Sequence, residues 1–219
     1  MFTTVTALLA ASAALVSGAS IPRSNSGSAS VTPHVQYSSS IGVLGCKINT
    51  NRVAYWPGSV NCNDICVKVS NGDRSLHLLR IDTSMGAYDI SYDAWNYLAF
   101  GQSAEKNPQM GGGVAMNYEY VDASQCADLL DGGKLPLSAA NSMNYVASCL
   151  GDSWVGKNHK LYNIANPTCT IGCDEQCSLD MAVSNQPKCP SGLGAVNNIS
   201  KNMAVSNIEY GTGKIVVSA

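Results

Sequence analysis

The sequence predicts a mainly β protein with a disulfide-rich, partly helical C-terminal part. Two observations predict this class. Short β-rich runs cut by turn residues fill positions 35–126, and nine cysteines are spread over the 219 residues. Cysteine is too rare for a scaffold built from disulfides alone, and a chain of roughly 200 residues can bury a core. We therefore expect a folded protein whose disulfides reinforce its core.

Residues 1–19 have the features of a secretory signal peptide. An apolar run at 7–16 precedes Ser17-Gly18-Ala19, a small-x-small cleavage pattern. We expect cleavage after Ala19, with a site two or three residues later as the alternative. No later stretch approaches the ~18 apolar residues that cross a bilayer. The expected protein is secreted and extracellular, with no membrane partner.

Residues 20–34 are rich in Ser, Gly, Ala and Pro, which predicts a flexible arm before the β-rich part. Short strands are then expected at 41–48 and 52–56. Alternating residues at 66–70, the turn pair Asn71-Gly72 and a return strand at 74–82 predict a β-hairpin.

A helix is expected at 92–100, with Ser91 as its N-cap and Gly101 as its end. Another strand is expected at 114–121, and the β-rich part ends near Cys126. Residues 127–219 form a cysteine-rich extension with a predicted helix at 137–150 and a predicted strand at 214–218.

Exported cysteines are mostly bridged, and an odd number leaves at least one free or paired between chains. The candidates are Cys46, Cys62, Cys66, Cys126, Cys149, Cys169, Cys173, Cys177 and Cys189. The spacing of the last four also fits a zinc site, but in an exported protein disulfides are the better interpretation, so we expect no metal and no cofactor. Asn198 begins a glycosylation acceptor, Asn198-Ile199-Ser200. A formal net charge of −2 argues against nucleic acid as a partner.

Several short motifs resemble the double-psi β-barrel of the expansin, barwin and rare lipoprotein A superfamily, in its secreted fungal form. They are Cys62-x3-Cys66-Val67-Lys68-Val69, the Asn71-Gly72 turn, 78–82, Tyr88-Asp89-Ile90-Ser91 and the glycine-led strand at 112–121. The resemblance implies a six-stranded barrel at 35–126. It also implies a shallow polysaccharide groove with the paired aspartates Asp82 and Asp89 beside it.

Asp82 and Asp89 are the candidate catalytic pair, since glycosidases use two carboxyl groups. Simple alternation places Arg80 and Asp82 on one face, so an ion pair between them is an equal alternative, and Asp89 fits a turn cap. The early His-Phe-Asp motif of expansins has no counterpart in this chain, which argues against hydrolysis. Candidate sugar-binding residues are Tyr55, Trp56, Arg80, Tyr88 and Tyr92. Trp56 is expected to be an exposed platform, and Trp95 to belong to the core.

The leading hypothesis is a secreted, expansin-like, non-catalytic protein that binds or loosens cell-wall polysaccharide: cellulose, chitin, glucan or peptidoglycan. An apoplastic effector role would be one form of this function. The alternatives are an endoglucanase or lytic transglycosylase that uses Asp82 and Asp89, and a defence or virulence module whose partner is a host protein.

Overall fold

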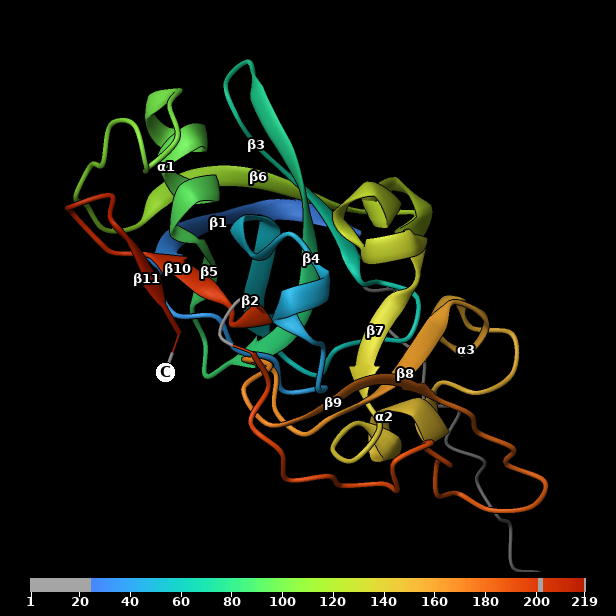
Figure 1. Ribbon diagram of the computed structural model, residues 1–219. Helices are drawn as coiled ribbons and strands as arrows, with labels where there is room; N and C mark the ends of the chain where they lie inside the picture. The colour runs from blue at the N-terminus through green and yellow to red at the C-terminus, as the bar shows by residue number, and fades with distance from the viewer. Residues whose placement is uncertain (1–24, 201–202, 219) are drawn as a thin grey trace, which may run out of the picture.

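A closed barrel of six strands forms the larger part of the protein (Figure 1). The computed structural model describes residues 25–200 and 203–218, so the predicted signal peptide lies outside the described residues. The barrel strands are β1 Ser26–His34, β2 Val53–Pro57, β3 Cys66–Asn71, β4 Arg74–Ser84, β5 Tyr88–Ser91 and β6 Val114–Val121. The predicted mainly β class is confirmed.

The barrel is mixed, with strand order β1-β5-β2-β4-β3-β6. The pairs β1–β5 and β2–β4 are parallel, and the remaining neighbours are antiparallel. Helix α1, Tyr92–Phe100, follows β5 directly and ends at Gly101, whose φ of 83° is the left-handed conformation that glycine adopts readily. The predicted hairpin, helix and strand at 66–82, 92–100 and 114–121 are therefore confirmed.

The predicted flexible arm is wrong from residue 26 onward. Residues 26–34 form β1, which pairs with β6 on one side and with β5 on the other and so closes the barrel. The Ser-, Gly- and Ala-rich composition suggested a flexible arm, but this strand requires small residues because large side chains lie close to it. A Cβ atom on Gly27 would lie 2.9 Å from the Tyr118 hydroxyl oxygen, so glycine makes room for that ring.

Short 3-10 turns, not a strand, follow β1. Residues 41–48 contribute only isolated bridges at Val43 and Ile48, with the turn η1, Gly45–Lys47, between them. Turn η2, Thr50–Arg52, then leads into β2. Further turns after β6 are η3, Ala123–Leu129, and η4, Asp131–Gly133.

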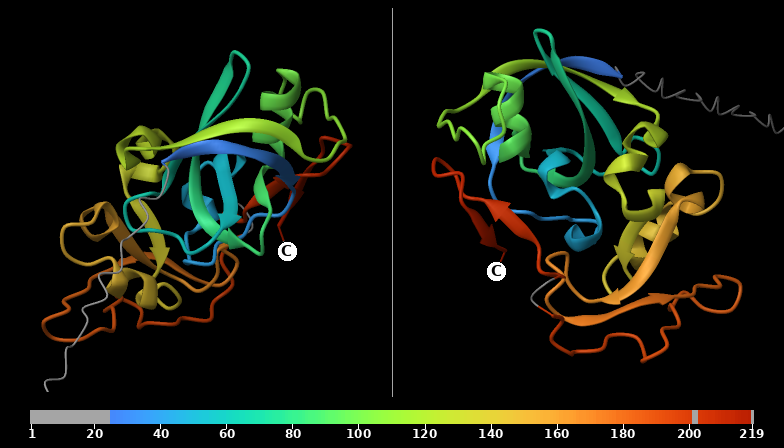
Figure 2. Two further views of the ribbon diagram at one scale, coloured as in Figure 1. Left: turned by 180° about the vertical axis from the view of Figure 1, so that it is seen from behind. Right: turned by 45° about the horizontal axis from the view of Figure 1, so that its top comes forward.

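The extension adds a second, three-stranded sheet beside the barrel (Figures 1 and 2). Its elements are β7 Leu135–Ser138, α2 Met143–Ser148, α3 Trp154–Lys157, β8 His159–Ile164 and β9 Gly172–Cys177. The helix predicted at 137–150 is thus half wrong: its first part is strand β7, because Leu135 and Leu137 pair with β8 and are fully buried.

After β9 the chain returns to the barrel and ends in a two-stranded hairpin (Figure 2). We call this hairpin, β10 Ser206–Ile208 and β11 Ile215–Val217, the C-terminal strap. The predicted strand at 214–218 corresponds to β11. Val205, directly before the strap, and Ile208, within it, are buried in two different core clusters, so this part of the chain is anchored to both.

Four disulfides hold the molecule together: Cys46–Cys169, Cys62–Cys149, Cys66–Cys126 and Cys177–Cys189. The first two join the barrel part to the extension. Cys173 is the free thiol of the described chain. Disulfides of this number are typical of proteins in an oxidising environment.

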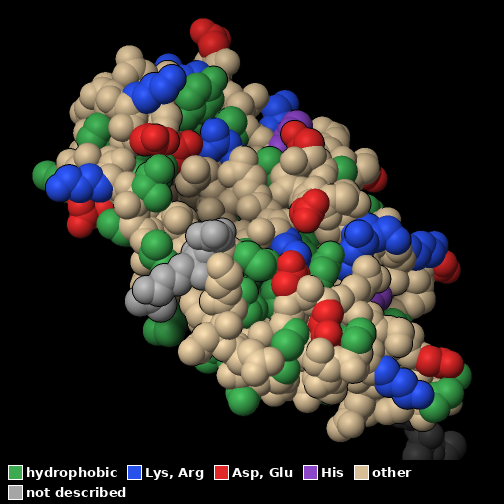
Figure 3. All heavy atoms as spheres, viewed as in Figure 1, with side chains coloured by type: hydrophobic (Ala, Val, Ile, Leu, Met, Phe, Trp, Pro, Cys, Tyr) green, Lys and Arg blue, Asp and Glu red, His purple; other side chains and the backbone are tan. Residues whose placement is uncertain are grey.

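One continuous core cluster includes barrel residues such as Val53 and Ile65 as well as extension residues such as Leu135 and Val155. The barrel and the extension therefore fold against each other. On the face drawn in Figure 3, basic and acidic side chains are interspersed without a patch of one sign. None of the helices in the described ranges is long and apolar enough to cross a membrane.

Candidate functional site

Four aromatic rings meet inside one end of the barrel. Trp56 of β2 lies edge-on to Tyr118 and Tyr120 of β6, at centroid distances of 4.9 and 6.0 Å. Strands β2 and β6 are not neighbours in the sheet, so these contacts cross the barrel interior. Tyr88 of β5 completes the group, 5.2 Å from Trp56. We call this end, where β2 and β4 finish and β5 begins, the mouth of the barrel.

The expectation that Trp56 is an exposed platform is wrong, because its side chain is 0% exposed. Alternation along β2 turns Ala54 and Trp56 inward, and the ring fills the barrel below the Pro57-Gly58 turn. Tyr88, Tyr118 and Tyr120 are half-buried and form the outer layer of the ring group. Trp95, in contrast, is core as predicted.

Arg80 is buried within the same end of the barrel, with 1% of its surface exposed. Its Nη2 donates to the carbonyl oxygens of Pro57 and Gly58, at 2.8 and 2.9 Å. The guanidinium carbon lies 5.8 Å from the centroid of the Tyr120 ring, a cation–π distance. Arg80 thus supports the turn that ends β2 and the ring that lines the mouth.

A cleft of about 400 Å³ opens beside this end of the barrel, between β6 and the extension. Its lining residues include Asn25, Asn63, Asp64, Tyr120, Asp122 and Trp154, and we call it the mouth cleft. Trp154 is half-buried at the start of α3, where its backbone N–H donates to the Asn63 side-chain oxygen at 2.7 Å. The Cys62–Cys149 disulfide fixes the two segments next to each other.

The lining of the mouth cleft has the chemistry of a sugar-binding surface. Tyr120 and Trp154 supply aromatic rings, on which the C–H faces of a sugar can pack, and the amides and carboxylates around them can bond hydroxyl groups. Hydrogen bonds from the Ser124 side chain and backbone lower the pKa of the Asp122 carboxyl, so it is an ionised acceptor at neutral pH. The residues of this cleft come from both the barrel and the extension.

Asp82 and Asp89 lie on the outer wall of the barrel, on either side of Tyr55. Tyr55 pairs with Asp82 of β4 and with Asp89 of β5, so the three residues form one row across three strands. Two strand spacings separate the carboxylate-bearing Cα atoms by about 10 Å. Tyr55 is thus the residue between the two aspartates in this row, where a glycosidase would place the scissile bond.

The predicted Arg80–Asp82 ion pair does not form, and the salt bridges of the described chain do not include it. The reason is a β-bulge: Ala54 pairs with Arg80, but the next residue, Tyr55, pairs with Asp82. The extra residue, Ile81, turns Arg80 inward and Asp82 outward.

Both carboxylates have local partners instead. Asp82 accepts hydrogen bonds from the Ser38 hydroxyl at 2.5 Å, the Ser40 backbone N–H at 2.8 Å and the Thr83 backbone N–H at 2.7 Å. Asp89 accepts a hydrogen bond from the Thr32 hydroxyl of β1. Asp82 therefore holds the segment that follows β1, and Asp89 ties β5 to β1.

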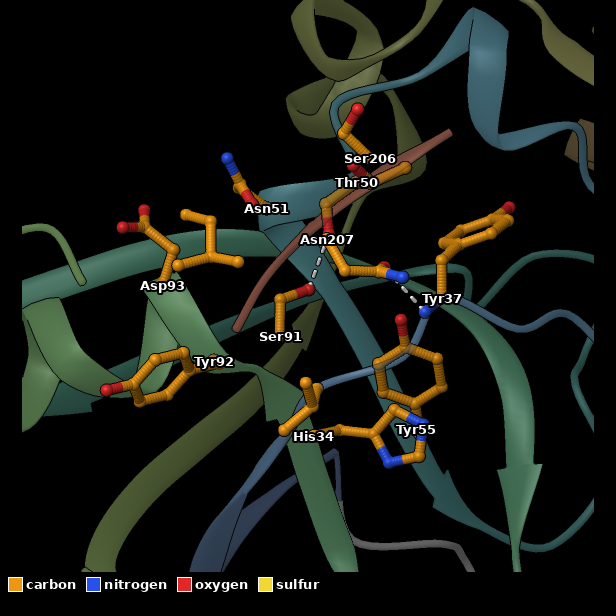
Figure 4. Close-up of a pocket in the computed structure, with 12 residues that line it drawn as sticks. His34, Tyr37, Thr50, Asn51, Tyr55, Ser91, Tyr92, Asp93, Ser206 and Asn207 are labelled. Atoms are coloured by element: carbon orange, nitrogen blue, oxygen red, sulfur yellow. Dashed lines mark hydrogen bonds between the residues drawn. The ribbon is translucent and has the colours of Figure 1, made fainter. Parts of the chain in front are cut away.

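The strap covers the end of this wall (Figure 4). The His34 and Tyr55 rings lie against each other in a tilted arrangement, with 4.1 Å between their centroids, and the Asn207 side chain accepts a hydrogen bond from the Tyr37 backbone N–H at 2.9 Å. The space left between them is about 10 Å³, room for no more than one water molecule. The wall around Tyr55 is filled by the protein itself.

Tyr92, the last predicted sugar-binding residue, lies at the start of α1 and is buried by the strap. Its hydroxyl donates to the Gln109 carbonyl oxygen, and its ring lies 5.0 Å from that of Tyr210. Ser91 occupies the N-cap position as predicted, but its hydroxyl bonds Val53 and Thr50 and does not cap the helix. The structure therefore brings Trp56, Arg80 and Tyr88 together and separates them from Tyr55 and Tyr92.

The residues that sequence reasoning missed are those of the mouth cleft. Trp154 and Tyr120 are 34 residues apart in the chain and meet only because the extension folds back onto the barrel. The sequence did contain one indication of this cleft. Asn63 and Asp64 are polar residues between Cys62 and Cys66, and the disulfides of these two cysteines hold the loop in place. In the described part of the chain, no cluster of His, Cys, Asp and Glu is suited to a metal ion.

Comparison of the chain with protein-family models, with curated proteins and with solved structures finds no match.

Proposed function

We propose that this chain is a secreted, non-catalytic protein with an expansin-like double-psi β-barrel, and that it binds cell-wall polysaccharide in the mouth cleft. Support for the barrel type comes from the closed six-stranded topology with its two parallel pairs. Support for secretion comes from the four disulfides and from the signal-peptide pattern at residues 1–19. An apoplastic effector role is one form of this function.

The observation that carries the proposal is the composition of the mouth cleft. Two aromatic rings, Tyr120 and Trp154, lie in one open cleft of about 400 Å³ with amide and carboxylate groups around them. An open cleft suits a polymer, since the sugar chain can continue beyond the part that is bound. The positions of Asp82 and Asp89 favour binding over hydrolysis, because Tyr55 lies between them and Asp82 already holds three hydrogen bonds.

A sedimentation assay tests this proposal. The mature protein is mixed with insoluble cellulose, chitin, β-glucan or peptidoglycan, and the bound fraction is measured for wild type, Trp154→Ala and Phe100→Ala. Phe100 is the matched control, an exposed aromatic residue on α1 at the other end of the barrel. We expect Trp154→Ala to weaken binding about tenfold, the loss of one stacked ring, and Phe100→Ala to bind like wild type.

Reducing-end assays on the same samples separate the alternatives. Release of sugar ends that Asp82→Asn and Asp89→Asn abolish, in variants that still fold, would select an endoglucanase or lytic transglycosylase. A saturable protein partner without any polysaccharide binding would select the defence or virulence module. Equal binding of wild type and Trp154→Ala would exclude the mouth cleft as the site.

A further inference from the structure

Three donor nitrogens at the mouth of the barrel have no acceptor among the described residues. Arg80 Nε and Nη1 and Trp56 Nε1 are buried, and none of them has a hydrogen-bond partner. Both residues contact Tyr120, Trp56 at 6.0 Å between ring centroids and Arg80 at 5.8 Å from its guanidinium carbon. The two residues that carry the unpaired donors thus both contact a ring that also lines the mouth cleft.

Beyond its cation–π contact with Tyr120, the charge of Arg80 has no carboxylate partner within the described ranges. Its bonded Nη2 faces two neutral carbonyl groups, and the ion pairs of the described residues join other side chains. Asp82, two residues away, is on the opposite face of the bulged strand. The charge of Arg80 also acts on Tyr145. Burial raises the pKa of the Tyr145 phenol, and the positive charge of Arg80 opposes this increase. A buried cation without a counter-ion is costly, and native proteins rarely keep one without a reason.

We propose that these donors receive the carboxylate of an acidic sugar unit, and that the polysaccharide bound in the mouth cleft is an acidic glycan of the uronate class. This inference rests on the proposed function and names its ligand. A carboxylate is planar, accepts several hydrogen bonds and matches the fork of a guanidinium, which is the pairing that Arg80 lacks. A neutral glucan would leave the charge unpaired.

The half-buried Tyr120 lines the cleft and contacts Arg80, which does not line it, so binding of the carboxylate to Arg80 requires the Tyr120 ring to move aside. Of the two rim carboxylates, Asp64 and Asp122, the second opposes the ligand only weakly. Asp122 is exposed, and solvent and salt screen exposed charges, whereas the buried charge of Arg80 is screened much less. The rim groups accept hydrogen bonds from sugar hydroxyls while the uronate carboxylate enters the mouth.

Calorimetric titration with three soluble probes tests the inference at 0.15 M salt. The probes are trigalacturonic acid, its methyl ester and cellotriose. We expect the acid to bind at least about tenfold more tightly than the ester, the value of one charge-assisted pair. Trp56→Phe removes one N–H and keeps an aromatic ring, and should reduce this preference about threefold. Arg80→Met should abolish it, and Phe100→Ala should leave it unchanged.

Equal affinity for the acid and its ester in wild type overturns the inference, as does an undiminished preference in both Trp56→Phe and Arg80→Met. If Arg80→Met does not fold, the inference is still tested by the affinities of wild type for the acid and its ester and by the effect of Trp56→Phe on that preference. The proposed function has a separate outcome: cellotriose or ester binding that depends on Trp154 supports it even without any preference for acid. Binding of none of the three probes and of no insoluble polymer overturns both.

Discussion

Asp82 accepts three hydrogen bonds on the outer wall of the barrel, two of them from the segment 38–40 that follows β1. This carboxylate replaces the backbone pairing that the segment lacks, since residues 38–40 belong to no strand. Its role in the fold can be measured without any assumption about function.

Asp82→Ala should lower the free energy of unfolding by about 2–4 kcal/mol, because three hydrogen bonds to a buried, charged acceptor are lost. The measurement is urea denaturation followed by circular dichroism. Asp73→Ala is the matched control: Asp73 is exposed at the tip of the β3–β4 hairpin, and its loss should change stability by less than about 0.5 kcal/mol. A loss for Asp82→Ala as small as that of the control would contradict the anchoring role.

Two buried tyrosines on the same wall predict a fall in stability at high pH. Burial, together with the Asp82 charge, raises the pKa of Tyr37 and Tyr55 above the usual value near 10. Above pH 10 the unfolded chain releases these protons more readily than the folded one, so stability is retained below pH 10 and falls as the pH rises above it. Denaturant midpoints between pH 8 and pH 11 measure this. Tyr55→Phe should reduce the loss of stability between pH 10 and pH 11. An unchanged loss would contradict the raised pKa of Tyr55 as its cause.

At the residue scale, alternation placed Leu76, Leu78 and Arg80 of β4 on one face correctly and failed at Asp82. The failure has one cause, the bulge at Ile81, which depends on how β4 pairs with the parallel strand β2. The residues of β4 alone do not predict such a bulge, because its position depends on the pairing with β2 and on the packing of Tyr55. The burial of Trp56 follows in the same way from a barrel interior that only the closed topology creates.

Among the elements, those with local signals were predictable. The β3–β4 hairpin has its Asn71-Gly72 turn, and α1 has its glycine end. Strand β1 could not be found, because Ser, Gly and Ala have no strand preference, and β6 and β5 impose the extended conformation on them. Likewise β7 is a strand because β8 pairs with it.

The strap offers a test at the element scale, because its two strands differ sharply in burial. Ile208 of β10 is 7% exposed and packs in the barrel cluster, whereas Ile215, its partner on β11, is 60% exposed. Ile208→Ala should cost about 2–4 kcal/mol of unfolding free energy, and Ile215→Ala less than about 1 kcal/mol. Urea denaturation of both variants measures this. Equal costs would mean that the strap does not pack on the barrel in solution.

For the molecule as a whole, the odd cysteine count predicted an unpaired thiol, but which of the nine is unpaired required the folded structure. Cys173 lies on β9 within 3.3 Å of the Asn197 side-chain nitrogen. We expect one reactive thiol per denatured chain with Ellman's reagent, and none in Cys173→Ser.

Cys173→Ser should also keep the unfolding midpoint of wild type, since no bridge is lost. A disulfide-linked dimer on a non-reducing gel that the same substitution removes would show instead that Cys173 pairs between chains. More than one thiol per chain would contradict the four bridges.

The bridges Cys66–Cys126, Cys62–Cys149 and Cys46–Cys169 lie one inside another along the chain, like nested brackets. A polypeptide that crosses a membrane from its N-terminus delivers the inner partner, Cys126, before Cys149, and Cys149 before Cys169. Each loop can therefore close as its second cysteine emerges, without reopening an earlier one and without threading one loop through another. For a chain that is exported, the order of delivery and the order of closure would coincide, and these bridges would form from the barrel outward during export.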